Sequence, residues 1–183
     1  PVLSQGKFNT LLSLNRPGFD VCDIDATYDP AEGGLQQAVA HLVVTAEQAV
    51  RDGKTILIIS DRGIAPGRLA IHSLMATGAV HHHLIRNGLR CDANLVIETA
   101  SARDSHQMAC LLGFGATAIY PYLAYSVLEE MIRDGELLGE PSSCYKNYRK
   151  GINKGLLKIM SKMGISAVSS YRGAQLFEAV GLA

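Results

Sequence analysis

Two apolar patterns alternate along this chain of 183 residues. Short stretches of contiguous or alternating apolar residues predict strands at 21–28, 54–60, 95–99, 116–120 and 166–169. Apolar positions that recur at helical spacing predict helices at 34–52, 70–87, 101–113, 123–134, 145–163 and 173–181. The unbroken run Ile-Leu-Ile-Ile within 54–60 is typical of a strand that is buried on both faces. We therefore predict an α/β protein, in which the strands of a parallel sheet alternate with helices.

The length of the chain limits how this sheet can be built. A complete (β/α)₈ barrel needs about 250 residues, so the chain has room for roughly five units. Two architectures remain open: a doubly wound sheet, or a partial (β/α) barrel-like domain. No Pro/Ser-rich linker and no repeat divides the sequence. We expect a single α/β domain over 1–183, with residues 1–20 as a peripheral lead-in.

Composition and charge exclude several classes of protein. Seventeen Lys and Arg balance seventeen Asp and Glu, whereas nucleic-acid and anionic-membrane binders need a basic surplus. No apolar stretch reaches the roughly 18–20 residues that span a bilayer. The chain begins at Pro1 without a signal-like leader, which favours a processed chain or a piece of a longer one.

The cysteines indicate a reducing compartment. They are scattered, without the spacing of a zinc site or the density of a disulfide scaffold. Their positions are Cys22, Cys91, Cys110 and Cys144. We expect reduced thiols and a cytoplasmic location.

Three consecutive histidines, His81, His82 and His83, are the first candidate for chemistry. Neighbouring side chains on a helix point about 100° apart, so the three cannot converge on one metal ion. His82 shares a helical face with Met75 and Ile85, which predicts a buried or interface histidine. A structural role is favoured over a metal or general-base role.

A lysine recurs at every fourth position of the helix predicted at 145–163. The stripe consists of Lys146, Lys150, Lys154, Lys158 and Lys162, and no acidic residue lies among them. This spacing winds slowly around the exposed side of the helix. The stripe is interpreted either as a solvated face or as a contact surface for an acidic partner or a phosphate.

Charged and polar residues follow the predicted strands, where α/β proteins gather their functional groups. The candidates for a cleft or interface at these strand ends are Asp61, Arg62, Glu98, Arg103, Tyr171 and Arg172. Charged groups next to buried strands need partners or a polar cleft. The loop at 100–103 has the outline of a barrel phosphate site but lacks the glycines that allow close backbone approach.

Long segments of the chain resemble the large subunit of glutamate synthase. They include DGKTILIISDRG at 52–63, LLGFGATAIYPYLA at 111–124 and KGLLKIMSKMGIS at 154–166. Further matching segments lie at 78–86, 95–103 and 170–182. They resemble the later part of the family's central domain, which lies between the glutaminase domain and the FMN-binding synthase barrel and is related in topology to that barrel.

The resemblance implies a role in making two glutamates from glutamine, 2-oxoglutarate and a reductant, with ammonia channelled between two sites. It implies FMN, a [3Fe-4S] cluster and NAD(P)H or ferredoxin in the parent enzyme. In this segment it implies no catalytic residue, cofactor or metal, because the family's N-terminal cysteine and cluster cysteines have no counterparts here. The expected partners are the glutaminase and FMN-binding domains, together with a small electron-delivering subunit.

The expected role is therefore a structural connector and ammonia-channel scaffold, with the lysine stripe as an interdomain surface. One alternative is a stand-alone flavin- or phosphate-binding half-barrel enzyme. It would use Arg62, Arg103 or Lys158 for phosphate and Glu98 or Asp61 as acid or base. The other alternative is an interaction module.

Overall fold

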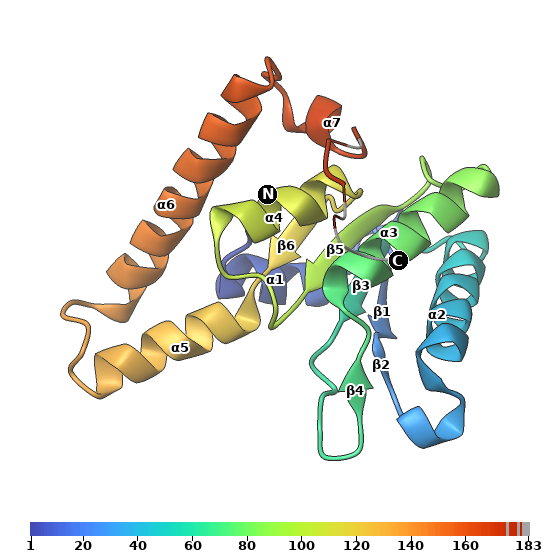
Figure 1. Ribbon diagram of the computed structural model, residues 1–183, viewed down its shortest axis with the longest axis horizontal. Helices are drawn as coiled ribbons and strands as arrows, with labels where there is room; N and C mark the ends of the chain where they lie inside the picture. The colour runs from blue at the N-terminus through green and yellow to red at the C-terminus, as the bar shows by residue number, and fades with distance from the viewer. Residues whose placement is uncertain (175, 179, 181–183) are drawn as a thin grey trace.

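The computed structural model describes residues 1–174, 176–178 and 180, and has a four-stranded parallel sheet at its centre (Figure 1). The strands are β1 (Val21–Asp25), β3 (Ile56–Ser60), β5 (Asn94–Glu98) and β6 (Ala118–Tyr120), in the order β1-β3-β5-β6. A separate antiparallel pair joins β2 (Thr27–Tyr28) to β4 (Leu69–Ala70). The predicted α/β class and parallel sheet are confirmed.

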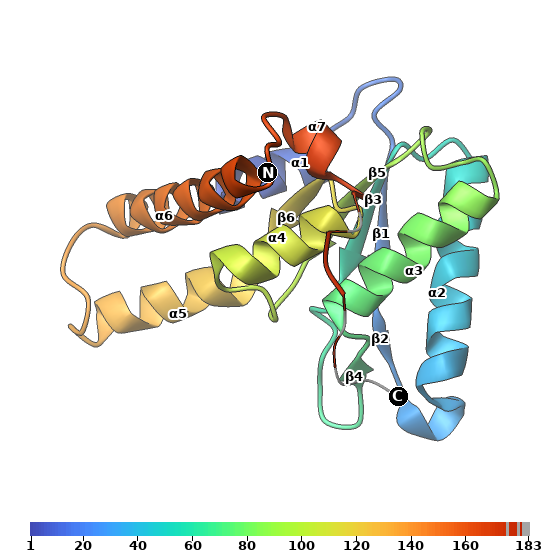
Figure 2. The same cartoon turned by 45° about the horizontal axis from the view of Figure 1, so that its top comes forward.

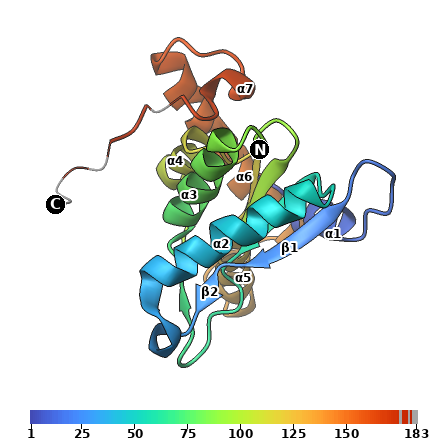
Figure 3. The same ribbon diagram turned by 90° about the vertical axis from the view of Figure 1, so that its right-hand side faces the viewer.

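Three helices connect consecutive strands of the sheet and cover one of its faces. They are α2 (Gly34–Arg51), α3 (Ser73–Arg86) and α4 (Ser105–Gly113), which gather on one side of the strands in Figures 1 and 3. Their buried side chains form one apolar cluster with alternate residues of the strands, such as Leu57, Ile59 and Ile97. Strands that follow chain order, with their helices on one face, are wound as in a barrel and not as in a doubly wound sheet. The described residues form an open, partial barrel.

The second face of the sheet is covered over only part of its area. α1 (Gln5–Leu12) and α5 (Tyr122–Arg133) pack there against β3, β5 and β6. Phe8 of α1 stacks on Tyr120 with ring centroids 4.2 Å apart. Val2 pairs with Ile119 at the outer edge of β6. The expected lead-in is thus packed on the sheet and contributes to the core.

α6 (Pro141–Lys162) follows α5, and the two extend from the sheet as a pair of helices (Figure 2). α6 packs through Ile152, Leu156 and Met160, which are buried in the cluster on the α2–α4 side. A short 3₁₀ helix, η1 (Pro30–Glu32), and the four-residue α7 (Val168–Tyr171) complete the elements.

Several predicted boundaries shift. The strand predicted at 21–28 is divided into β1 and β2, because Ala26 leaves the parallel ladder between them. α4 begins after Asp104, whose side chain forms a capping box with Gln107, so the helix start predicted at residue 101 is wrong.

The last predicted strand and helix are not observed. Residues 166–169 form no strand, and from Val168 the chain turns into α7. The stretch Ser-Ala-Val-Ser is short and half polar, and its last two residues already belong to α7. Of the helix predicted at 173–181, the described residues 173–174, 176–178 and 180 are not helical, and the remainder lies outside the described residues.

Candidate functional site

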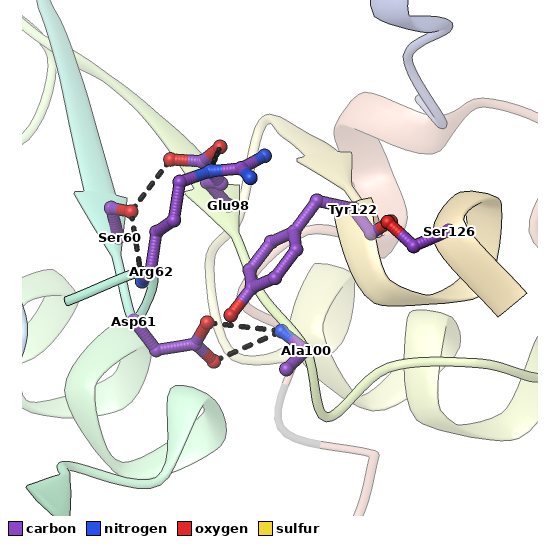
Figure 4. A network of polar contacts seen from close by, with 7 residues as sticks. All are labelled: Ser60, Asp61, Arg62, Glu98, Ala100, Tyr122 and Ser126. Atoms are coloured by element: carbon purple, nitrogen blue, oxygen red, sulfur yellow. Dashed lines mark hydrogen bonds and ion pairs between the residues drawn. The ribbon is translucent and has the colours of Figure 1, made fainter. Parts of the chain in front are cut away.

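Five polar side chains meet where β3, β5 and β6 end, and we call them the strand-end cluster: Ser60, Asp61, Arg62, Glu98 and Tyr122 (Figure 4). In the sheet register Ser60 lies beside Glu98, and Glu98 lies beside Tyr120. Because parallel strands all end at the same edge, residues far apart in the sequence are brought together here.

Glu98 is the centre of this cluster. It is 5% exposed, accepts a hydrogen bond from Ser60 Oγ at 2.6 Å and forms an ion pair with Arg62 at 2.7 Å. Burial alone would lower the pKa of Arg62, but the hydrogen bond and charge of Glu98 raise it above its ordinary value. The Arg62 guanidinium also lies 4.1 Å from the centroid of the Tyr122 ring. The buried carboxylate is therefore compensated by a guanidinium that an aromatic ring holds in place.

Asp61 ties the β3 loop to the β5 loop. Its two carboxylate oxygens accept hydrogen bonds from the Ala100 N–H at 3.0 and 3.1 Å (Figure 4), and from Thr99 Oγ1 at 2.6 Å. Burial and the neighbouring Asp61 carboxylate raise the pKa of Tyr122 far above its ordinary value. Tyr122 therefore stays a neutral phenol and does not act as a base.

An open pocket lined mainly by charged and polar residues lies beside the cluster, on the face of the sheet that α2–α4 do not cover. Its volume is about 410 Å³, and its lining includes Asp23, Asp25, Ser60, Arg62 and Glu98. Burial, together with the charges of Glu98 and Asp25, raises the pKa of Asp23. The pocket combines carboxylates with one guanidinium and a hydroxyl, which suits small polar or cationic molecules.

The structure brings together three of the six predicted cleft residues: Asp61, Arg62 and Glu98. Arg103 lies exposed before α4, and its carbonyl accepts a hydrogen bond from Tyr148 at 2.9 Å. Tyr171 is 1% exposed and packs beside Phe177.

Arg172 lies elsewhere, because the strand predicted at 166–169 does not form. It donates to Thr117 Oγ1 at 3.0 Å. Thr117 directly precedes β6, so Arg172 lies at the amino ends of the strands, away from the strand-end cluster.

Tyr122, Asp23 and Asp25 were not among the cleft residues predicted from the sequence. The alternation of polar and apolar residues through β1, Val-Cys-Asp-Ile-Asp, was the available signal for two carboxylates on one face.

The histidine assignment needs a correction. His81, at 8% exposure, is the buried histidine, whereas His82 is half-buried on a face where Met75 and Ile85 are exposed. Arg90 Nε donates to His81 Nδ1 at 2.8 Å, and burial followed by the charge of Arg90 lowers the pKa of His81 to about 4. The inward face of α3 carries Ala76, Thr77, Val80, His81 and Leu84, so the predicted phase of this helix was wrong by one position.

Gly115 explains how the buried ring fits. Its φ is +114°, in the region that favours glycine, and a Cβ there would overlap the His81 ring. His81 is thus a neutral acceptor built into the core.

The lysine stripe is exposed along α6, as predicted. All five lysines lie on the solvent side, opposite Ile152, Leu156 and Met160. No carboxylate of the described residues forms a salt bridge with any of them, since the salt bridges among these residues all involve arginine or histidine. The stripe leaves its charge available at the surface.

The loop before α4 does not fit a phosphate group. At this N-terminus Asp104 accepts from the Gln107 N–H at 2.8 Å, and Gln107 Oε1 accepts from the Asp104 N–H at 3.3 Å. A carboxylate occupies the position that a phosphate would need, and it would repel one. FMN is therefore not accommodated at this barrel-type position.

Within the described part of the chain, no three His, Cys, Asp or Glu side chains converge as a metal site requires. Among the same residues, no helix combines the length and hydropathy needed to cross a bilayer.

Fold and site together define a partial-barrel α/β domain with a buried ion-pair cluster at its strand ends. The particular family follows from comparison with known proteins. The family model of the glutamate synthase central domain matches residues 1–183, and the chain belongs to this family.

Full-length glutamate synthases contain this segment. The chain is 42% identical to the glutamate synthase (NADH) of Saccharomyces cerevisiae and 44% identical to the glutamate synthase (NADPH) large chain of Azospirillum brasilense. It is 41% identical to the chloroplastic ferredoxin-dependent glutamate synthase of Spinacia oleracea. Each match covers 100% of the chain, which spans only 9% to 12% of the length of these relatives.

Proposed function

We propose that this chain is the connecting domain of a glutamate synthase, and that it walls a route for ammonia between two active-site domains. The parent enzyme makes two glutamates from glutamine, 2-oxoglutarate and a reductant. FMN, a [3Fe-4S] cluster and NAD(P)H or ferredoxin belong to other parts of that enzyme. The relatives in yeast, Azospirillum and spinach are named for NADH, NADPH and ferredoxin respectively, which supports the reaction but leaves the donor of this chain open.

The observation that carries this proposal is the open polar face of the sheet. A sheet in an α/β protein is normally covered on both faces, yet Asp23 and Asp25 are exposed beside a pocket of about 410 Å³. Such a face is suited to being closed by another domain. The enclosed space would be polar and shielded from bulk water, as a route for a small reactive intermediate requires.

In this role the residues of the cluster hold the wall in shape. Glu98 fixes Arg62 and Ser60, and Asp61 fixes the β5 loop. These groups are already paired with one another, which favours a positioning role over acid–base chemistry. The proposed partners are the glutaminase and FMN-binding domains of the same polypeptide.

The lysine stripe supplies a second proposed contact. Lys146, Lys154 and Lys162 mark its length along α6, free of salt bridges to the described residues. We assign it to an acidic interdomain surface or to a small electron-delivering subunit. The four free cysteines support a reducing compartment, and we place the protein in the cytoplasm.

The ammonia route is tested with Asp23→Arg in the full-length enzyme. Asp23 forms no salt bridge with the residues that the structure describes, and the longer side chain enters the proposed route. We expect ammonium to be released and the yield of glutamate per glutamine consumed to fall. Asp92→Arg, on the exposed loop before β5, is the matched control. Equal coupling in the two variants and the unmodified enzyme would contradict the route.

The second candidate, a flavin-binding half-barrel, makes the opposite prediction for this segment. Full-length protein carrying Asp104→Lys removes the carboxylate that opposes phosphate in the α4 capping box. The scaffold role predicts unchanged FMN content and reduction rate. A changed FMN stoichiometry would favour the half-barrel instead.

A further inference from the structure

A second pocket, which no motif of the sequence indicated, lies between the start of α3 and α4. It has a volume of about 200 Å³, and Ser73, Ser101, His106 and Cys110 are among the residues that line it. We call it the α3–α4 pocket. This volume is several times the roughly 30 Å³ that one liquid water molecule occupies, so the pocket admits a small organic molecule.

A chain of hydroxyl groups connects the α3–α4 pocket to the strand-end cluster. Thr99 Oγ1 lies 2.6 Å from Asp61 Oδ2, and Ser101 Oγ lies 3.0 Å from Thr99 Oγ1. Ser73 Oγ lies 2.6 Å from Ser101 Oγ. Ser73 is 6% exposed and stands at the pocket wall. The three hydroxyls therefore join a buried carboxylate to the pocket without interruption.

The carboxylate of Asp61 fixes the direction in which these hydroxyl groups donate their hydrogen bonds. Both oxygens of Asp61 accept hydrogen bonds, from the Ala100 N–H and from Thr99 (Figure 4 shows the Ala100 bonds). With its hydrogen committed to Asp61, Thr99 can only accept from Ser101, and Ser101 then accepts from Ser73. An anion at one end polarises such a chain, so every hydroxyl points its hydrogen toward Asp61. Ser73 Oγ is left with a lone pair and no hydrogen for the pocket.

Two backbone donors beside the pocket are already engaged. The Leu74 N–H donates to His72 Nδ1 at 3.3 Å, and the Gln107 N–H donates to Asp104. The residues that line the pocket include no Asp, Glu, Lys or Arg. No carboxylate, ammonium or guanidinium of the described residues lines the pocket, and the buried Ser73 Oγ offers it an acceptor, which favours a neutral donor over an ion.

We propose that the α3–α4 pocket binds a small neutral molecule carrying an N–H donor, such as a primary amide, with its N–H directed to Ser73 Oγ. This site goes beyond the proposed scaffold role and does not depend on it. Asp61 acts on the ligand only through Thr99, Ser101 and Ser73, as a residue that sets the direction of the hydrogen bonds.

Cys110 reports occupancy of the pocket. Its thiol is half-buried at the pocket wall, 3.7 Å from His106 Nε2, whereas Cys91 is exposed and lies outside the pocket. The rate of modification by methyl methanethiosulfonate is measured for both thiols in the full-length protein. Trypsin separates them, because cleavage follows Arg90 and Arg103, and mass spectrometry follows each peptide.

The two probe ligands are acetamide and acetone, which have the same size and the same carbonyl but differ in the N–H donor. We expect acetamide to slow modification of Cys110 roughly threefold at twice its dissociation constant, with Cys91 unaffected. Acetone should give no protection. Ser73→Ala should abolish protection by acetamide, whereas Ser73→Thr, which keeps the hydroxyl, should retain it.

Asp61→Asn gives the sharpest test because it reverses the direction of the hydrogen bonds between the three hydroxyl groups. The amide of Asn donates to Thr99, so each hydroxyl turns and Ser73 presents its hydrogen to the pocket. Acetone should then protect Cys110 in this variant, a gain that a merely structural role for Asp61 does not predict. If Asp61→Asn fails to fold, the Ser73 pair decides the question alone. Equal protection by both probes in the unmodified protein, or protection that survives Ser73→Ala, overturns the proposal.

Discussion

The two faces of the central sheet carry different residue types, although the residues on one face are the direct neighbours along each strand of those on the other. Ile24, Ile59, Ile97 and Ile119 form one row across the sheet, and the next row contains Asp25, Ser60, Glu98 and Tyr120. Successive side chains of a strand point to opposite faces. The isoleucine row therefore faces α2–α4, while the second row faces the open pocket and the strand-end cluster.

This difference shows which face holds the fold and which is left for function. All four isoleucines are 3% exposed or less, so the covered face is packed as a protein interior. On the other face Ser60 and Glu98 are buried by pairing with each other and with Arg62, and Asp23 and Asp25 remain exposed. A shift in register of one residue would exchange the two rows and bury these carboxylates, so the two patterns together fix the register.

The largest expected effect comes from the covered face. Ile97 is fully buried in the central strand β5, and Ile97→Ala leaves a cavity that its neighbours cannot fill. We expect the free energy of unfolding to fall by about 3–4 kcal/mol, as for other large-to-small changes in a core. Urea denaturation of the variant measures this loss. Leu138→Ala, at a side chain that is 88% exposed, is the control and should change stability by less than about 0.5 kcal/mol. A loss below about 1 kcal/mol for Ile97→Ala would mean that the isoleucine row is not the main core.

His81 extends the comparison to a polar group on the covered side. Its pKa is lowered to about 4 by burial and by the charges of Arg90, His82 and Arg172, in that order, against an ordinary value of 6.5. Between these two values the unfolded chain binds a proton that the folded chain does not. The stabilisation is therefore complete above pH 6.5 and lost as the pH falls toward 4, by about 2–3 kcal/mol in total.

This loss is measured by urea denaturation at a series of pH values. His81→Gln should flatten the dependence between pH 6.5 and pH 4, whereas His41→Gln, at an exposed position on α2, should leave it unchanged. If His81→Gln keeps the full slope, the acid sensitivity belongs to other groups.

The ion pair of the polar face should matter less. Glu98→Gln keeps the shape and the contact with Ser60 but removes the charge that pairs with Arg62. Because the side chain of Arg62 is 53% exposed, water replaces part of the lost interaction, and we expect about 1–2 kcal/mol of destabilisation. The comparison is with Glu47→Gln on α2, whose carboxylate pairs with Arg51 and with His83 and for which a smaller loss is expected because the solvent screens these pairs. Equal effects in urea denaturation would show that burial of Glu98 adds nothing.

The sequence predicted the covered face better than the polar one, for a physical reason. Runs such as residues 56–59 carry their own signal, because burial on both sides demands apolar residues at every position. The lysine stripe of α6 was predicted for the same kind of reason, since its helical phase is set by Ile152, Leu156 and Met160 on the other side. Local pattern determines local placement in these cases.

Contacts between distant segments could not be predicted in this way. The meeting of Arg62 with Glu98 and Tyr122 depends on strand order, which no local pattern specifies. The prediction at 166–169 failed because strand propensity is weak in a segment of four residues, and the second half of this segment belongs to α7. Arg172, which follows α7, therefore lies near the amino ends of the strands and not near their carboxyl ends. The resemblance to glutamate synthase supplied the family, which the chemistry of the residues alone did not.

Asp23 gives the smallest and most informative effect. Burial and the charges of Glu98 and Asp25 raise its pKa, so the folded chain holds a proton more tightly than the unfolded chain does. Stability therefore falls as the pH rises through the two pKa values, and Asp23→Asn should stabilise the isolated chain at pH 7 by about 0.5 kcal/mol or less, since the side chain is exposed. Urea denaturation at pH 7 and at pH 3 tests the sign, because the gain should disappear at the lower pH.

Asp92→Asn, on the exposed loop before β5, controls for a general change in net charge. A loss of stability in Asp23→Asn would show that this carboxylate stabilises the fold. It would also remove the support that the exposed polar face gives to the proposed ammonia route.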